Sequence, residues 1–269
     1  MKIRVNHKTI YKFDSIVPRL TQSLKLYPSK CKNQKIINWT VKSNKGSIIN
    51  SYTDALGHKI LNLFNINIKG KQIISSEGII DTRDFSGVMK GLSDKVNHLC
   101  FLRQTKLTEP CSKIIELSKK VKKNENNVIN FCHELNLICS ESIKYVSGST
   151  NSVTSARKSV EMGKGVCQDF AHILISLARL NNLPARYING FLLEDKNSKE
   201  SFSHAWVEIY VENLGWIAFD PSHKKCIDDK YVRISCGLDF LDASPIKGVT
   251  TNYSGNESLD VKLSINMCQ

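Results

Sequence analysis

Three short segments contain residue types that together could perform nucleophilic catalysis. They are GKGVCQDFAH around Cys167, FSHAWVEIYV around His204 and GWIAFDPS around Asp220. A thiol, an imidazole and a carboxylate can act as a nucleophile, a base and a group that orients the base. We therefore predict that Cys167, His204 and Asp220 form a catalytic triad for acyl transfer through a covalent thioester.

The residues around Cys167 predict the start of a helix at this position. Gly163 and Gly165 precede it, and an apolar stripe at helical spacing follows, formed by Phe170, Ile173, Leu174 and Leu177. In the first turn of a helix, unpaired N–H groups and the positive end of the dipole stabilise an anion, which favours the reactive thiolate. We expect the sulfur to point toward the sheet on which this helix packs.

His204 and Asp220 are expected on two neighbouring antiparallel strands. Alternation over residues 202–211 places His204 opposite the aliphatic face, and a second strand begins after Gly215. A two-residue turn would put the two side chains on opposite faces. A three-residue loop with Gly215 in the left-handed conformation would put Asp220 opposite Trp206 and diagonal to His204. Diagonal neighbours lie about 7–8 Å apart at the backbone, within reach of a hydrogen bond. We predict an odd-numbered loop or a bulge.

At these residues the chain resembles the transglutaminase-like superfamily of cysteine enzymes, and more closely its bacterial branch of transglutaminase-like cysteine proteases. PARYINGFLLED from Pro184 to Asp195 and CGLDFLDASPIKG from Cys236 to Gly248 also resemble that branch. SLKLYPSKCKNQKI and Asp54-Ala55-Leu56-Gly57 resemble its β-rich N-terminal domain, although His58 follows where Asn is more usual. The resemblance implies that Cys167, His204 and Asp220 are catalytic and that the substrate is a protein or peptide.

The hydrophobic pattern changes its period near residue 100, which predicts two domains. Residues 1–100 alternate as in antiparallel strands, whereas apolar stripes from Cys111 to Val121 and from Val128 to Ile143 predict helices. A short helix should end near Gly163, and strands should follow the cysteine helix. We expect an α+β protein. A β-rich domain over residues 1–100 precedes a papain-like, transglutaminase-like catalytic domain over residues 101–269, with helices packed on an antiparallel sheet.

Composition excludes several other classes of protein. The 269 residues contain no apolar run of about 18 residues, so no membrane span is predicted. The N-terminal residues alternate like a strand and lack a secretory signal, so a cytoplasmic location is the default expectation. Nine cysteines, an odd number without CxxC pairs, predict neither a disulfide framework nor a zinc site. Cys111, Cys132 and Cys139 fit apolar helical stripes and are assigned to the core.

The net charge of +13 does not by itself predict binding to nucleic acid. Nucleic-acid footprints are clustered and rich in Arg and aromatic residues, whereas here the basic residues are spread along the chain. The densest run, Lys119 to Lys123, comes at the end of a predicted helix, where cations suit the helix dipole. A solvated surface is the preferred interpretation.

Three functions share this set of residues. Water as the second nucleophile gives a peptidase or amidase, which the bacterial resemblance favours, and a lysine amine gives a protein-crosslinking transglutaminase. The third is a peptide-binding module without activity. The triad mechanism needs neither a metal nor an organic cofactor. The sequence leaves the natural substrate and the oligomeric state open.

Four further residues are assigned to the surroundings of the triad. The backbone N–H of Cys167 should donate to the oxyanion, and Gln168 and Tyr145 are the two candidates for a second donor. His172 is turned by about 140° around the helix from Cys167, so it should pack or form a hydrogen bond rather than act as the base. His223 is expected to be exposed, or to lie at the rim of the site.

Overall fold

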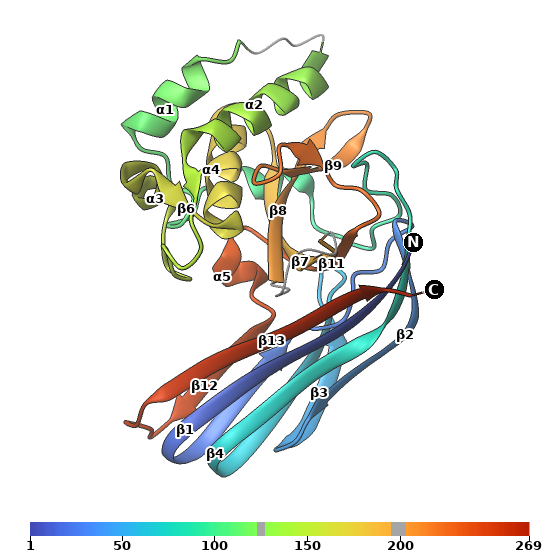
Figure 1. Cartoon of the computed structure of the whole chain (residues 1–269), viewed down its shortest axis with the longest axis vertical. Coiled ribbons are helices and arrows are strands. Elements are labelled where there is room, and N and C mark those ends of the chain that lie inside the picture. Colours follow the sequence, from blue (N-terminus) through green and yellow to red (C-terminus); the bar gives the residue numbers. More distant parts are fainter. Residues whose placement is uncertain (123–126, 195–202, 269) are drawn as a thin grey trace.

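The computed structural model describes residues 1–122, 127–194 and 203–268. Lys123, Asp195 and Phe202, which belong to segments discussed above, lie outside these ranges. A long, strand-rich sheet lies at one end of the molecule and the helices lie at the other, with a second sheet between them (Figure 1). Within the described ranges, no helix combines the length and the apolar character that crossing a bilayer requires.

The long sheet has six strands, and its strand pairs are antiparallel. They are β1 (Lys2–Leu24), β2 (Gln34–Ser43), β3 (Ser47–Thr53), β4 (Lys59–Thr82), β12 (Ile246–Thr251) and β13 (Glu257–Met267). The two longest strands, β1 and β4, pair along nearly their whole length and form the centre of the sheet. Burial alternates along β1, as the sequence pattern predicts for a strand with one covered face.

The C-terminal strands complete this sheet. β13 pairs with β1 from Ile3 to Phe13, and β12 pairs with β1 from Arg19 to Leu24. The N-terminal sheet is therefore built from residues on both sides of the division predicted at residue 100. A pairing between the two ends of a chain is a long-range contact, which local periodicity does not reveal. The termini lie close together at the edge of the molecule (Figure 1).

The half of the molecule that holds the helices contains a five-stranded antiparallel sheet with strand order β10-β9-β8-β7-β11 (Figure 1). Its strands are β7 (Ala185–Leu192), β8 (Ser203–Val211), β9 (Gly215–Asp220), β10 (Lys225–Cys226) and β11 (Tyr231–Gly237). The α-helices are α1 (Ser112–Lys119), α2 (Val128–Ser142), α3 (Ala156–Met162), α4 (Cys167–Leu180) and α5 (Phe240–Ala243). A 3₁₀-helix, η1 (His98–Leu102), precedes them, and the short strands β5 (Lys144–Tyr145) and β6 (Lys164–Gly165) pair in parallel.

Helices packed on an antiparallel sheet confirm the predicted α+β class and the transglutaminase-like core. In the described part of the chain, the sequence analysis did not anticipate the 3₁₀-helix η1 or α5, a single short turn.

Helix α4 is the central element of the core. Asp169 to Arg179 are all buried, so the helix is enclosed on every side rather than along one stripe. Its apolar residues pack with α2 and with β8, and Cys132 and Cys139 of α2 lie in the same cluster, as predicted. Each fully buried aliphatic side chain contributes about 1.5–3 kcal/mol to folding. The helix that begins with Cys167 is therefore firmly held.

Buried charges connect the five-stranded sheet to the N-terminal domain. Glu208 on β8 accepts hydrogen bonds from Nε of Arg186 and Nε of Arg233, each at 2.7 Å. Arg233 Nη1 donates to Ser29 Oγ at 2.6 Å, and Gln34 Nε2 donates to the carbonyl oxygen of Arg233 at 2.8 Å. Ser29 and Gln34 lie between β1 and the start of β2. The segment that joins the two N-terminal strands is thus tied to β11 by buried polar contacts.

Candidate active site

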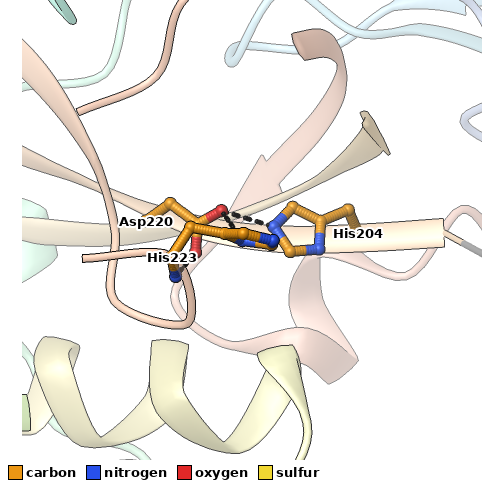
Figure 2. Close-up of side chains that lie close together, drawn as sticks. All are labelled: His204, Asp220 and His223. Atoms are coloured by element: carbon orange, nitrogen blue, oxygen red, sulfur yellow. Dashed lines mark hydrogen bonds and ion pairs between the residues drawn. The ribbon is translucent and has the colours of Figure 1, made fainter. Parts of the chain in front are cut away.

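The register of β8 and β9 brings His204 and Asp220 together. Val211 pairs with Gly215 and Val207 pairs with Phe219, so three residues form the loop and Asp220 comes opposite Trp206. Gly215 has φ of 83°, the left-handed conformation that the sequence analysis predicted. Both side chains therefore lie on one face of the sheet. His204 Nε2 and Asp220 Oδ2 are 2.6 Å apart (Figure 2).

Cys167 is the first residue of α4, where its own N–H has no acceptor within the helix. The helix start is fixed by Asp169, whose Oδ2 accepts a hydrogen bond from the backbone N–H of Val166 at 2.8 Å. Thr150 Oγ1 and Ser159 Oγ each donate to the same buried carboxylate at 2.6 Å. Gly165 lies against it so closely that an added Cβ would come within 2.6 Å of Asp169 Cβ. Asp169 therefore positions the N-terminus of the cysteine helix.

Cys167 lies close enough to His204 to influence the pKa of its ring. Because Nε2 of the ring faces Asp220, Nδ1 is the nitrogen left for the sulfur. Burial alone would lower the pKa of His204, but hydrogen bonds to Asp220 and Cys167, together with their negative charges, raise it to about 10. The imidazole is therefore protonated at neutral pH, and a protonated ring next to a thiol favours the thiolate. Cys167 itself is partly buried, at the edge of the core.

Asp220 accepts hydrogen bonds through both carboxylate oxygens. Ser222 donates to Oδ1 from its backbone N–H at 2.9 Å and from its hydroxyl at 2.6 Å. Tyr231 donates its hydroxyl to Oδ2 at 2.8 Å, and His223 Nδ1 lies 2.9 Å from the same atom. Burial acts to raise the pKa of Asp220, but the bonds from His204 and His223 hold it below its usual range. The carboxylate is ionised and cannot rotate freely.

Two of these residues, Ser222 and Tyr231, were not assigned to the site by the sequence analysis. Ser222 follows Asp220 by two positions, and this spacing is typical of turns closed by a carboxylate. The sequence could therefore have predicted its contact with Asp220. Tyr231 reaches the site from β11 on another part of the chain, and no local pattern announces it. His223 is 40% exposed, which agrees with the rim position considered, but its ring nitrogen also contacts the triad carboxylate.

Three further residues that the sequence analysis placed around the triad are Gln168, Tyr145 and His172. Gln168 is half-buried, and its amide donates to the backbone oxygen of Asn151 at 3.2 Å. Tyr145 lies within the electrostatic influence of Cys167 and Asp220. Burial raises the pKa of Tyr145 to about 12, and the charges of Cys167, Glu194 and Asp220 act in the same direction. His172 is fully buried and its Nε2 accepts the backbone N–H of Phe240 at 3.1 Å, which confirms the predicted hydrogen-bonding role.

The described residues contain one group of side chains with the composition of a metal site, His204, Asp220 and His223. Its ligand atoms overlap the triad, so catalysis and metal binding would compete for them.

Comparisons with known proteins agree with this architecture. Residues 115–221 match the model of the transglutaminase-like superfamily, and residues 3–74 match that of the bacterial transglutaminase-like N-terminal region. The chain therefore contains a transglutaminase-like core together with the N-terminal region found in bacterial transglutaminase-like proteins.

Relatives with similar sequences include proteins of mycobacteria. An uncharacterized protein from Mycobacterium leprae is 23% identical over 280 residues, covering 98% of this chain and 97% of its own. Another, from Mycobacterium bovis, is 30% identical over 131 residues, covering 45% of this chain and 42% of its own. These relatives support the family and carry no further statement of activity.

A solved structure has the same fold along nearly the whole chain. It belongs to a proposed cysteine protease from Cytophaga hutchinsonii and superimposes with a TM-score of 0.78 at 23% identity. The match covers 99% of this chain and 90% of that one. At this level of identity, the similarity establishes the arrangement of both domains.

Proposed function

We propose that the protein is a cysteine-dependent acyl-transfer enzyme that cleaves amide bonds in a peptide or protein, with Cys167 as the nucleophile. The observation that carries the proposal is the convergence of two other elements, β9 and α4, on the histidine of β8. Asp220 binds one ring nitrogen of His204, and Cys167 at the start of α4 lies close enough to the same ring to influence its pKa. A thiol, an imidazole and a carboxylate in this relation can form and resolve a thioester.

The steps follow from the positions of the groups. His204 holds the proton of Cys167 as an imidazolium, and the thiolate attacks the amide carbonyl to form a tetrahedral oxyanion. The oxyanion collapses, the bond to nitrogen breaks, and His204 donates its proton to the departing amine. Water then attacks the thioester, releases the acid and restores Cys167. Asp220 keeps the ring oriented throughout.

The oxyanion needs two hydrogen-bond donors, and we assign these to the backbone N–H of Cys167 and the hydroxyl of Tyr145. Tyr145 pairs with Gly165 across β5 and β6, and the N–H of Val146 donates to the oxygen of Gly165 at 2.9 Å. These contacts anchor Tyr145 beside the start of α4. The Gln168 amide is directed to Asn151, so the hydroxyl of Tyr145 is the better donor.

The test compares the wild-type protein with Cys167→Ala on a peptide library, with and without a primary amine, and analyses the products by mass spectrometry. Cleaved peptides formed only by the wild type support hydrolysis. Amine adducts without cleavage would replace hydrolysis with transamidation, because both reactions share the thioester. Identical, unchanged peptides with both proteins would refute an acyl-transfer enzyme and leave a peptide-binding module.

A further inference from the structure

Asp220 lies between two imidazole rings, and the proposed mechanism uses only one of them. His204 Nε2 and His223 Nδ1 lie 2.6 Å and 2.9 Å from the same oxygen, Oδ2 (Figure 2). The ring centroids of the two histidines are 5.2 Å apart in an edge-to-face arrangement. One ligand atom from each of the three residues lies within 4.8 Å of the others.

We propose that His204, Asp220 and His223 form a binding site for a zinc ion, which takes the place of the protons between these side chains. Two imidazole nitrogens and one carboxylate oxygen, with a fourth position open, are a ligand set that zinc accepts in proteins. Tetrahedral zinc with bonds near 2.0–2.1 Å separates its ligand atoms by about 3.3 Å. The contacts to Oδ2, now 2.6 Å and 2.9 Å, would each open by less than 1 Å.

The surroundings hold the ligands in the orientation that a metal needs. Ser222 fixes Oδ1 of Asp220 with two hydrogen bonds, and the hydroxyl of Tyr231 donates to Oδ2. Such outer contacts keep a ligating carboxylate in place and increase affinity. The side chain of His223 is 40% exposed, whereas those of His204 and Asp220 are 8% and 0% exposed. His223 therefore provides the route by which an ion enters from solvent.

Zinc at this site would separate His204 from Asp220 without binding the nucleophile. Cys167 does not belong to the group of side chains whose ligand atoms lie within 4.8 Å of one another, so the ion would coordinate Nε2 and leave the sulfur outside the ligand set. The ring would lose the carboxylate that orients it. Zinc would therefore inhibit the enzyme. This inhibition rests on the proposed function, whereas the binding of zinc does not depend on it.

Binding is therefore tested on the full chain carrying Cys167→Ala, which has no nucleophile. Zinc chloride is titrated into the metal-free protein by calorimetry, and Co²⁺ is used as a spectroscopic substitute. We expect one ion per chain and tetrahedral cobalt bands without a sulfur-to-cobalt charge-transfer band. Adding His223→Gln, or His223→Asn as a second replacement, should weaken binding by at least about tenfold.

His133→Gln is the matched control, because His133 is also an exposed histidine of the half that holds the helices but packs against Phe219 outside the cluster. It should leave the affinity unchanged. Equal affinity with and without His223, or a charge-transfer band showing that other thiols hold the ion, would overturn the zinc site. Because the tested chain lacks Cys167, neither result depends on whether the protein cleaves peptides.

Discussion

His204 and Asp220 occupy diagonal positions on adjacent strands because Gly215 ends the loop between them in the left-handed conformation. The loop has three residues, and this odd number sets the face of β9 on which the Asp220 side chain lies. A shift by one residue would move Asp220 to the opposite face of the sheet. The geometry of the proposed triad therefore depends on a residue that contributes no side chain.

Replacing Gly215 with Ala should impair both stability and the reactivity of Cys167. A Cβ would meet nothing within 4 Å, so the cost comes from the backbone at φ of 83° and amounts to about 1 kcal/mol. Relief of that strain would displace β9 relative to β8. Urea unfolding gives the stability, and mass spectrometry after iodoacetamide treatment gives the alkylation rate of Cys167.

Gly70→Ala provides the matched control for this change. Gly70 has φ of 71° and equally open surroundings, but it lies within β4 in the N-terminal sheet. It should lower the free energy of unfolding by a similar amount and leave the alkylation rate of Cys167 unaltered. Equal slowing of alkylation by both substitutions would contradict a specific role for Gly215.

Asp220→Asn should slow the Cys167-dependent reaction by roughly a hundredfold or more, because an amide neither orients His204 in the same way nor stabilises its positive charge. Tyr231→Phe removes one donor to the same oxygen. It should lower the free energy of unfolding by about 1.5–3 kcal/mol, yet change the rate only a few-fold. The comparison of the two rates checks whether the carboxylate acts on His204 or serves only the packing of the sheet.

The pH dependence of alkylation tests the ion pair directly. Since the pKa of His204 is raised to about 10, the imidazolium persists across neutral pH and loses its proton only above that value. The alkylation rate of Cys167 should therefore stay nearly constant from neutral pH to about pH 9, where His204 keeps its proton. An ordinary thiol titrates near pH 8.5, so free cysteine treated alongside should be alkylated faster with each step upward in pH within that range. Parallel profiles for the two cysteines would exclude the pair.

Gly165→Ala should disturb the start of the cysteine helix by steric overlap. The new Cβ would lie 2.6 Å from Asp169 Cβ and 2.8 Å from its Oδ2, displacing the carboxylate that fixes Val166. Overpacking of this kind costs about 1–3 kcal/mol, and Cys167 should be alkylated more slowly. Gly163→Asn is the control, because Gly163 has φ of 66° and open space, and Asn tolerates that conformation. Unfolding and alkylation should both remain near the wild-type values there.

Local patterns in the sequence predicted the parts of the site that depend on neighbouring residues. The helix start at Cys167, the three-residue loop and the shared face of His204 and Asp220 all follow from periodicity and turn chemistry. Family resemblance supplied the roles that those positions would have. The cytoplasmic location and the division at residue 100 stay predictions of the sequence.

The contacts that no local pattern predicts come from distant segments. Tyr231 meets Asp220 only because β11 joins the far edge of the sheet, and β13 pairs with β1 from the opposite end of the chain. The buried cluster of Arg186, Glu208 and Arg233 is likewise formed by three strands. Each of these is fixed by tertiary packing, which a single sequence read by periodicity does not specify.

The burial of the His172 ring predicts that the protein loses stability in acid. Burial lowers the pKa of His172 to about 4, with the Arg179 charge acting in the same direction and Asp239 opposing it. The unfolded chain, with its ordinary value near 6.5, therefore binds the proton first as pH falls. The contribution of neutral His172 to the free energy of unfolding is fully present above about pH 6.5. It declines by about 1.4 kcal/mol per pH unit until the pH reaches about 4.

His172→Gln separates this effect from general acid denaturation. A glutamine can still accept a hydrogen bond but does not titrate, so the variant should start less stable at pH 7 and lose stability more gradually. Urea unfolding at pH 7 and at pH 4.5 should show wild type losing about 2–3 kcal/mol more than the variant between these conditions. His7, whose pKa is also lowered by burial to about 4, is present in both proteins and cancels from the difference. Parallel losses in the two proteins would mean that His172 takes up its proton equally well in the folded chain, which would contradict its buried neutral state.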